Sequence, residues 1–292
     1  MLYTIENEKI RVVIDSVGAE FHNLILKEDG TEYLWQGDPE YWKGRAFNLF
    51  PICGRLVGGK YTYKGKDYRM EIHGFLRTSD TEVTEQTADR ITFRLTDSGE
   101  TRAQYPFGFE VLVTYVLSGN TVKTVYTVRN TGDTVLPFAL GGHPGFNIPL
   151  LPGERFEDYY LEFGEAAPAK MMVFSDACMY TDEVRDFPLE GGKVLPLRHS
   201  LFDNDAIFLR DMSRKVTLKN TKNPKTVEVC FDEFPYLGLW HAPRKPAPYL
   251  CIEPWSGVPS YEGVVDDMDT KKDMFRLAPG GVYETSFTVT IR

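Results

Sequence analysis

The sequence predicts an all-β protein, built as one large antiparallel β-sandwich that spans residues 1–292 as a single domain. Three observations predict this fold class. Apolar and polar residues alternate with a period of two over much of the chain, the alternating segments are rich in β-branched and aromatic residues, and Gly and Pro are spread along the chain as turn residues. No long segment places apolar residues at helical spacing.

The predicted strands follow one another from near the N-terminus to the C-terminus. Alternating or β-branched segments occur at 10–14, 21–26, 90–95, 215–218, 226–230 and 283–292. The clearest pattern is FEVLVTYVL at 109–117 followed by TVKTVYTVRN at 121–130, with Ser118, Gly119 and Asn120 between them. Two long strand patterns around such a short turn predict a β-hairpin.

Helix signals are scarce. The segment TRAQYP at 101–106 is short and stops at Pro106, and the segment 261–275 has room for only a turn or two. The segment GRLVGGK at 54–60 matches most of a phosphate-binding loop, but Tyr61 stands where that motif needs Ser or Thr. The residues that follow alternate as in a hairpin, so the helix N-terminus that binds the phosphate is missing.

Composition and charge exclude several classes of function. The formal net charge of −9 disfavours a nucleic-acid partner, which usually requires a basic face. No apolar stretch is long enough for a membrane span, and the N-terminus lacks the pattern of a signal peptide. The four cysteines are scattered and form no C-x-x-C pair, which disfavours a zinc site and fits a reducing compartment. We therefore expect a cytoplasmic protein that binds neither membrane nor nucleic acid.

Several short stretches place polar side chains where strands or turns would otherwise be apolar. They are NLFPICGRL at 48–56, EIHGFLR at 71–77, GGHPGFN at 141–147, LFDNDAIFL at 201–209 and CIEPWSGVPS at 251–260. In GGHPGFN the glycines and the proline predict sharp bends on both sides of His143. Glu253 is notable because a glutamate at the end of an apolar strand is rarely buried unless it is paired or functional.

Taken as one cleft, these stretches suit a small hydroxylated ligand such as a sugar. Trp240 and Trp255 offer flat apolar faces, and a few convergent polar groups would fix the orientation of the ligand. A histidine can act as a general acid or base at neutral pH, and a carboxylate is its natural complement. His22, His199 and His241 lack such a context, and we expect them to be structural.

The ordered set of NLFPICGRL, IHGFLR, LGGHPGFNIPL, NDAIF and IEPWSGVPS resembles the aldose 1-epimerase (galactose mutarotase-like) family, most closely its LacX-like branch. The resemblance covers nearly the whole chain. It implies a large β-sandwich of the galactose mutarotase type and the interconversion of the α and β anomers of a hexose or hexose phosphate, without metal or cofactor. Its implied partner is a small-molecule sugar, and we expect a monomer or a homodimer.

The resemblance also implies roles for individual residues. His143 would be the general acid and Glu253 the general base, while Arg55 and His73 would hold the sugar. The substrate-binding aspartate would come from FDNDAIF. We favour Asp205 because it directly precedes the apolar strand, but Asp203 would share its side in an extended segment. We also expect Trp240 to bind the sugar, through the flat apolar face of its ring.

Two other functions fit the same residues. The first is a non-catalytic carbohydrate-binding protein that keeps the cleft without the activity. The second is a glycoside hydrolase that uses Asp205 and Glu253 as its carboxylate pair. A hydrolase releases a product from a glycoside, whereas an epimerase releases none.

Overall fold

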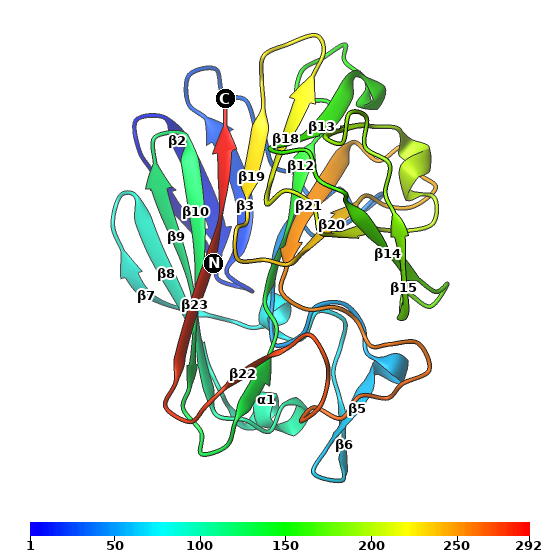
Figure 1. The fold of residues 1–292 in the computed structure, drawn as a ribbon. Coiled ribbons are helices and arrows are strands. Elements are labelled where there is room, and N and C mark those ends of the chain that lie inside the picture. The colour runs from blue at the N-terminus through cyan, green and yellow to red at the C-terminus, as the bar shows by residue number, and fades with distance from the viewer.

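The computed structural model describes all 292 residues, and two large sheets dominate it (Figure 1). In the larger sheet the strands follow the order β16 (Val194–Pro196), β13 (Tyr159–Phe163), β18 (Lys215–Asn220), β19 (Val227–Cys230), β23 (Val282–Ile291), β10 (Thr121–Asn130), β9 (Phe109–Ser118), β8 (Arg90–Thr96) and β7 (Glu82–Gln86). In the second sheet the order is β15 (Tyr180–Asp186), β14 (Lys170–Phe174), β17 (Ile207–Arg210), β20 (Tyr236–Trp240), β21 (Tyr249–Trp255), β12 (Gly141–Asn147) and β4 (Ala46–Leu49). All neighbouring strands in both sheets are antiparallel.

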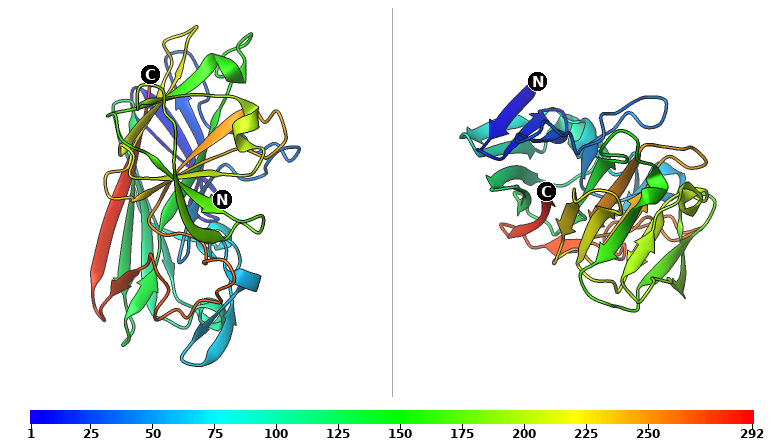
Figure 2. Two further views of the ribbon diagram at one scale, coloured as in Figure 1. Left: turned by 45° about the vertical axis from the view of Figure 1, so that its right-hand side comes forward. Right: turned by 90° about the horizontal axis from the view of Figure 1, so that it is seen from above.

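Three smaller sheets and a few short helices complete the fold. The small sheets are β1–β2–β3 (Leu2–Glu6, Ile10–Asp15, Glu20–Leu26), β5–β6 (Lys60–Tyr63, Lys66–Arg69) and β11–β22 (Leu136–Phe138, Phe275–Leu277). The helices are the α-helix α1 (Gly99–Gln104) and the 3₁₀ helices η1 (Val57–Gly59), η2 (Leu76–Thr78), η3 (Phe156–Asp158) and η4 (His199–Phe202). The β5–β6 hairpin projects from one end of the molecule in two different views (Figures 1 and 2). None of the helices has the length and apolar character needed to cross a bilayer.

The two large sheets pack face to face, which confirms the predicted β-sandwich. Tyr126 of β10 donates a hydrogen bond from its hydroxyl to Asn48 Oδ1 of β4, over 2.7 Å. A Cβ added to Gly142 of β12 would lie 2.7 Å from the ring of Phe287 of β23, so the glycine permits this close approach. Alternate residues of the seven-stranded sheet therefore point into the sandwich, and the others point to its outer face.

The hairpin predicted from 109–130 is present. Ser118 pairs with Thr121 at the end of β9 and β10, and the two strands stay in register as far as Phe109 and Asn130. The segment 54–60 does not open an α-helix: it forms the short 3₁₀ helix η1 and leads into the β5–β6 hairpin, as its alternation predicts.

The prediction of sharp bends around His143 is wrong. Residues 141–147 form the continuous strand β12, which lies between β21 and β4 in the seven-stranded sheet. Its glycines serve close packing: a Cβ at Gly141 would lie 2.9 Å from the Trp255 ring, and none of the three glycines of β12 has a positive φ. Pro144 lacks an N–H group, a feature that normally argues against a central strand.

Candidate active site

The candidate site lies on the outer face of the seven-stranded sheet, where one row of residues crosses several strands. Phe208 of β17 pairs with Gly238 of β20, Gly238 pairs with Glu253 of β21, and His143 of β12 pairs with Phe47 of β4. The flanking pairs of β12 and β21 place His143 opposite Glu253. The row is therefore continuous, and it forms the floor of a cavity.

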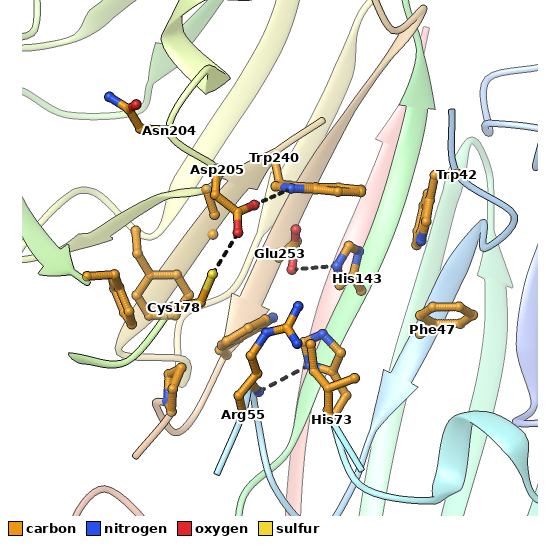
Figure 3. A pocket seen from close by; sticks show the side chains of 18 of the residues that line it. Trp42, Phe47, Arg55, His73, His143, Cys178, Asn204, Asp205, Trp240 and Glu253 are labelled. Atoms are coloured by element: carbon orange, nitrogen blue, oxygen red, sulfur yellow. Dashed lines mark hydrogen bonds and ion pairs between the residues drawn. The ribbon is translucent and has the colours of Figure 1, made fainter. Parts of the chain in front are cut away.

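The cavity has a volume of about 360 Å³, large enough for a monosaccharide. Side chains from several strands and from the loops above them surround it (Figure 3). Its lining consists of Trp42, Phe47, Gly54, Arg55, Ile72, His73, Arg77, His143, Phe174, Ser175, Cys178, Asn204, Asp205, Ala206, Phe208, Gly238, Trp240, Glu253, Trp255 and Pro259. All six residues singled out for the site, Arg55, His73, His143, Asp205, Trp240 and Glu253, belong to this set.

His143 and Glu253 contact each other on the cavity floor. His143 Nε2 lies 3.2 Å from Glu253 Oε2, and the two residues are 8% and 2% exposed. Burial lowers the pKa of His143 to about 3 and raises the pKa of Glu253 well above its usual value; the charge of Asp205 raises the latter further. The pair therefore favours a neutral imidazole and a neutral carboxyl group, with a proton shared along the contact.

His73 presents an N–H donor to the same cavity. The backbone N–H of Gly54 donates to His73 Nδ1 over 3.1 Å, which assigns the ring proton to Nε2. Burial, with nearby positive charge, lowers the pKa of His73 well below its usual value, so the ring is neutral. His73 adopts a positive φ of 66°, and Gly74 follows with a φ of 72°, where any Cβ would collide with the carbonyl of Phe50. This explains the His-Gly pair in the sequence.

Asp205, and not Asp203, lines the cavity. Its Oδ1 accepts a hydrogen bond of 2.7 Å from Trp240 Nε1, and its Oδ2 accepts one of 3.0 Å from the thiol of Cys178 (Figure 3). Burial, together with Asp205, raises the pKa of Cys178 to about 11, which keeps the thiol protonated and able to donate. The carboxylate is thus fixed between two donors, and its remaining lone pairs are free to accept hydrogen bonds from a ligand.

Two arginines line the cavity, and neither forms an ion pair within 4.0 Å. Arg55 is exposed and extends into the cavity (Figure 3). Arg77 donates from Nε to the carbonyl of Ile72 over 3.0 Å and lies 5.5 Å from the centre of the Phe47 ring. Arg77 belongs to the EIHGFLR stretch, but its sequence context indicated no role for it. Its guanidinium group keeps its terminal N–H donors available.

Several aromatic residues of the lining were not predicted, and some of them, such as Trp42 and Phe174, lie outside the polar stretches. Trp42 stacks on His143, with 4.9 Å between ring centroids and 31° between ring planes. Phe174 and Phe208 form the opposite wall, with ring centroids 5.5 Å apart. Trp255, which the sequence did suggest as an apolar face, packs edge-on against His73 at 5.2 Å. A strand pattern shows that such residues are buried, but it does not tell which face of which sheet they share.

The other three histidines lie outside the lining of the cavity. His199 and His241 contact each other over 3.2 Å, and His22 contacts Glu20 over 3.3 Å. The residues that could offer donors to a metal ion are His143, Cys251 and Glu253, whose donor atoms lie within 4.8 Å of one another. Burial raises the pKa of the Cys251 thiol well above its usual value and so opposes the thiolate that a metal requires. That no metal takes part stays a prediction.

This chain is similar to known proteins along almost its whole length. The family model described as Aldose 1-epimerase matches residues 1–287. The chain is 36% identical to the chromosomal protein LacX of Lactococcus lactis subsp. lactis over 299 aligned positions, which cover 100% of this chain and 99% of the relative.

Solved structures show the same similarity in three dimensions. A galactose mutarotase related enzyme from Lactobacillus acidophilus superimposes with a TM-score of 0.95 at 36% identity, covering 100% of this chain and 97% of the other. A galactose mutarotase-like protein from Lactobacillus casei gives a TM-score of 0.95 at 32% identity and full coverage of both chains. The predicted resemblance and the galactose mutarotase-like fold are thus confirmed.

Proposed function

The chain belongs to the aldose 1-epimerase family, and on that premise we propose that it is an isomerase that interconverts the α and β anomers of a hexose or a hexose phosphate. The observation that carries the proposal is the His143–Glu253 contact of 3.2 Å on the cavity floor. Anomer exchange requires one group that removes a proton and another that supplies one, close enough together to serve adjacent oxygens of one sugar.

The reaction follows from the two side chains. Glu253 takes the proton from the anomeric hydroxyl while His143 gives a proton to the ring oxygen, and the C1–O5 bond breaks to give the open-chain aldehyde. C1 then turns about the C1–C2 bond. When O5 attacks the other face of the carbonyl, His143 takes a proton back from O5 and Glu253 returns one to the carbonyl oxygen. Every proton that leaves the sugar is matched by one that returns.

These proton transfers require His143 to start as an imidazolium and Glu253 as a carboxylate. This ionised form of the pair holds the same number of protons as the form in which both groups are neutral. A sugar hydroxyl that donates to Glu253 favours the carboxylate, because hydrogen bonds to the charged form stabilise it. The face of Trp42, stacked at 4.9 Å, favours the imidazolium. We infer that substrate binding shifts the shared proton towards His143.

The remaining residues hold the sugar. His73 donates from Nε2, Asp205 accepts from sugar hydroxyls, and the Trp240 ring provides an apolar face. Arg55 donates from its guanidinium group. Together with Arg77 it supplies positive charge that no carboxylate within 4.0 Å neutralises, which supports a hexose phosphate as one candidate substrate.

Polarimetry tests the proposal. Freshly dissolved α-glucose, α-galactose and glucose 6-phosphate each change optical rotation as they equilibrate, and the protein should accelerate at least one of them. Saturable sugar binding without acceleration would instead identify a non-catalytic carbohydrate-binding protein. Release of a free sugar from a glycoside would identify a hydrolase. Both oxygens of Asp205 accept from fixed donors, which makes that carboxylate poorly suited to donate a proton to a leaving group.

A single domain, a cytoplasmic location and a monomer or homodimer stay predictions. Gel filtration at several protein concentrations tests the last of these.

A further inference from the structure

A group of buried polar residues lies behind the cavity wall, and the reaction does not use it directly. Ser260, Asp266 and Lys271 are 0%, 6% and 5% exposed. Lys271 Nζ lies 3.2 Å from Asp266 Oδ2, and the hydroxyl of Ser260 donates to the same oxygen. Desolvating a buried ion pair costs about as much free energy as the pair regains, so such a pair adds little to stability. This one is therefore expected to have another role.

The group is connected to Arg55. The backbone N–H of Ser260 donates to the carbonyl oxygen of Arg55 over 2.8 Å, and Ser260 Oγ accepts from the N–H of Val57 over 3.2 Å. Ser260 therefore holds the backbone on both sides of Leu56. Asp266 orients the Ser260 hydroxyl so that its lone pairs face Val57, and Lys271 fixes Asp266.

Arg55 needs such support because its side chain is exposed and no carboxylate within 4.0 Å fixes its orientation. It lines the main cavity and also a neighbouring hollow of about 240 Å³, so the guanidinium group has room to turn away from a sugar. The residue before Arg55 is also held in place. Gly54 donates a hydrogen bond from its N–H to His73 Nδ1, and its carbonyl oxygen accepts one from the N–H of His73. Pro259, which precedes Ser260, packs so closely on Gly54 that a Cβ there would lie 2.4 Å from the proline ring.

We propose that Ser260 is a positioning residue for Arg55, oriented by the buried Asp266–Lys271 ion pair, and that it keeps the guanidinium group over the main cavity for substrate binding. The inference rests on the proposed function, since it assigns Arg55 to the sugar. It explains why a buried ion pair lies beside this loop, and it makes substrate affinity depend on residues that never touch the sugar.

The test is a double-mutant cycle of Ser260→Ala and Arg55→Met, with KM and kcat from polarimetry and sugar affinity from tryptophan fluorescence. Arg55→Met should raise KM roughly 10-fold or more, as expected for the loss of a hydrogen bond from a charged group. Ser260→Ala alone should raise KM about 5-fold with kcat nearly unchanged, and should have little further effect when Arg55 is already Met. Asp158→Asn, which breaks the remote Asp158–Lys222 ion pair, is the control and should leave KM unchanged in both backgrounds.

A Ser260→Ala protein with unchanged KM, or one whose effect is equally large in the Arg55→Met background, would overturn the inference. If Ser260→Ala does not fold, the double variant Asp266→Leu/Lys271→Met replaces the ion pair with apolar side chains and frees the hydroxyl to rotate. It should raise KM in the same way, and an unchanged KM would again contradict the inference. Should the wild-type protein bind a sugar without accelerating its mutarotation, the proposed function fails, while the affinity measurements still decide the role of Ser260.

Discussion

His143 and Glu253 lie opposite each other on the neighbouring strands β12 and β21, with 3.2 Å between Nε2 and Oε2. The ladder pairs Gly141 with Trp255 and Gly145 with Cys251, but no residues pair between these positions. Pro144 and Pro254 lie within that gap, and neither has an N–H group to donate. The two side chains therefore come together where the backbone ladder is open.

We expect Glu253→Gln and His143→Asn each to lower kcat by about 100-fold or more, the low end for removal of one acid–base group. The double variant should be scarcely worse than either single variant, because the two groups act as a unit. Polarimetry with the best substrate measures all three. Wild-type rates in both single variants would disprove the catalytic assignment.

The pH dependence of kcat/KM should be bell-shaped, because the pair works only with its one shared proton. At low pH His143, whose pKa is about 3, takes up a proton while Glu253 stays protonated. No carboxylate then remains to act as the base. At high pH the shared proton leaves as the pH passes the raised pKa of Glu253, and the acid is lost. Rates corrected for spontaneous mutarotation over roughly pH 4 to 9 should show the alkaline limb clearly. Glu253→Gln should abolish that limb, and a residual activity with an unchanged alkaline limb would contradict the assignment.

Glu253→Gln should also stabilise the protein near neutral pH. The folded-state pKa of Glu253 is raised, so the unfolded chain ionises first as the pH rises and the wild type loses stability above the normal glutamate pKa. Each unit of raised pKa corresponds to about 1.4 kcal/mol, so the variant should be more stable than the wild type at pH 7. Urea unfolding at pH 7 and pH 4 measures this gain. The gain should be much smaller at pH 4, where the carboxyl group is mostly protonated in both states.

Asp205→Asn should weaken sugar binding more than it slows turnover. The new amide NH₂ must face either the indole N–H of Trp240 or the thiol of Cys178, both of which are donors. We expect KM to rise about 10-fold, with a smaller change in kcat. Asp203→Asn is the matched control, since Asp203 lies outside the cavity lining and should behave as wild type. Equal effects of the two substitutions would contradict the role of Asp205.

The period-two alternation was sufficient to predict the fold class because long strands of the larger sheet, such as β10 and β23, bury one face more than the other. It failed at β12, where Gly and Pro normally indicate a turn and where only the neighbouring strands reveal the need for small residues. The polar stretches led to residues that do line the cavity, because polar side chains at strand ends are rarely buried unless they are paired or functional. The choice between Asp203 and Asp205 lay beyond the sequence, since Asp205 has a φ of 76° and the segment is not extended.

The row from Phe208 through Gly238 and Glu253 to His143 lies on the interior strands β17, β20, β21 and β12 of a sheet and not on a flexible loop, and Phe47 extends it onto the edge strand β4. Separating its members would require breaking the central strands, which are among the last parts of a fold to open. On heating, loss of activity should therefore coincide with cooperative unfolding. The amide hydrogens of β12 and β21 that are hydrogen-bonded in the sheet should exchange with solvent only when the whole molecule unfolds.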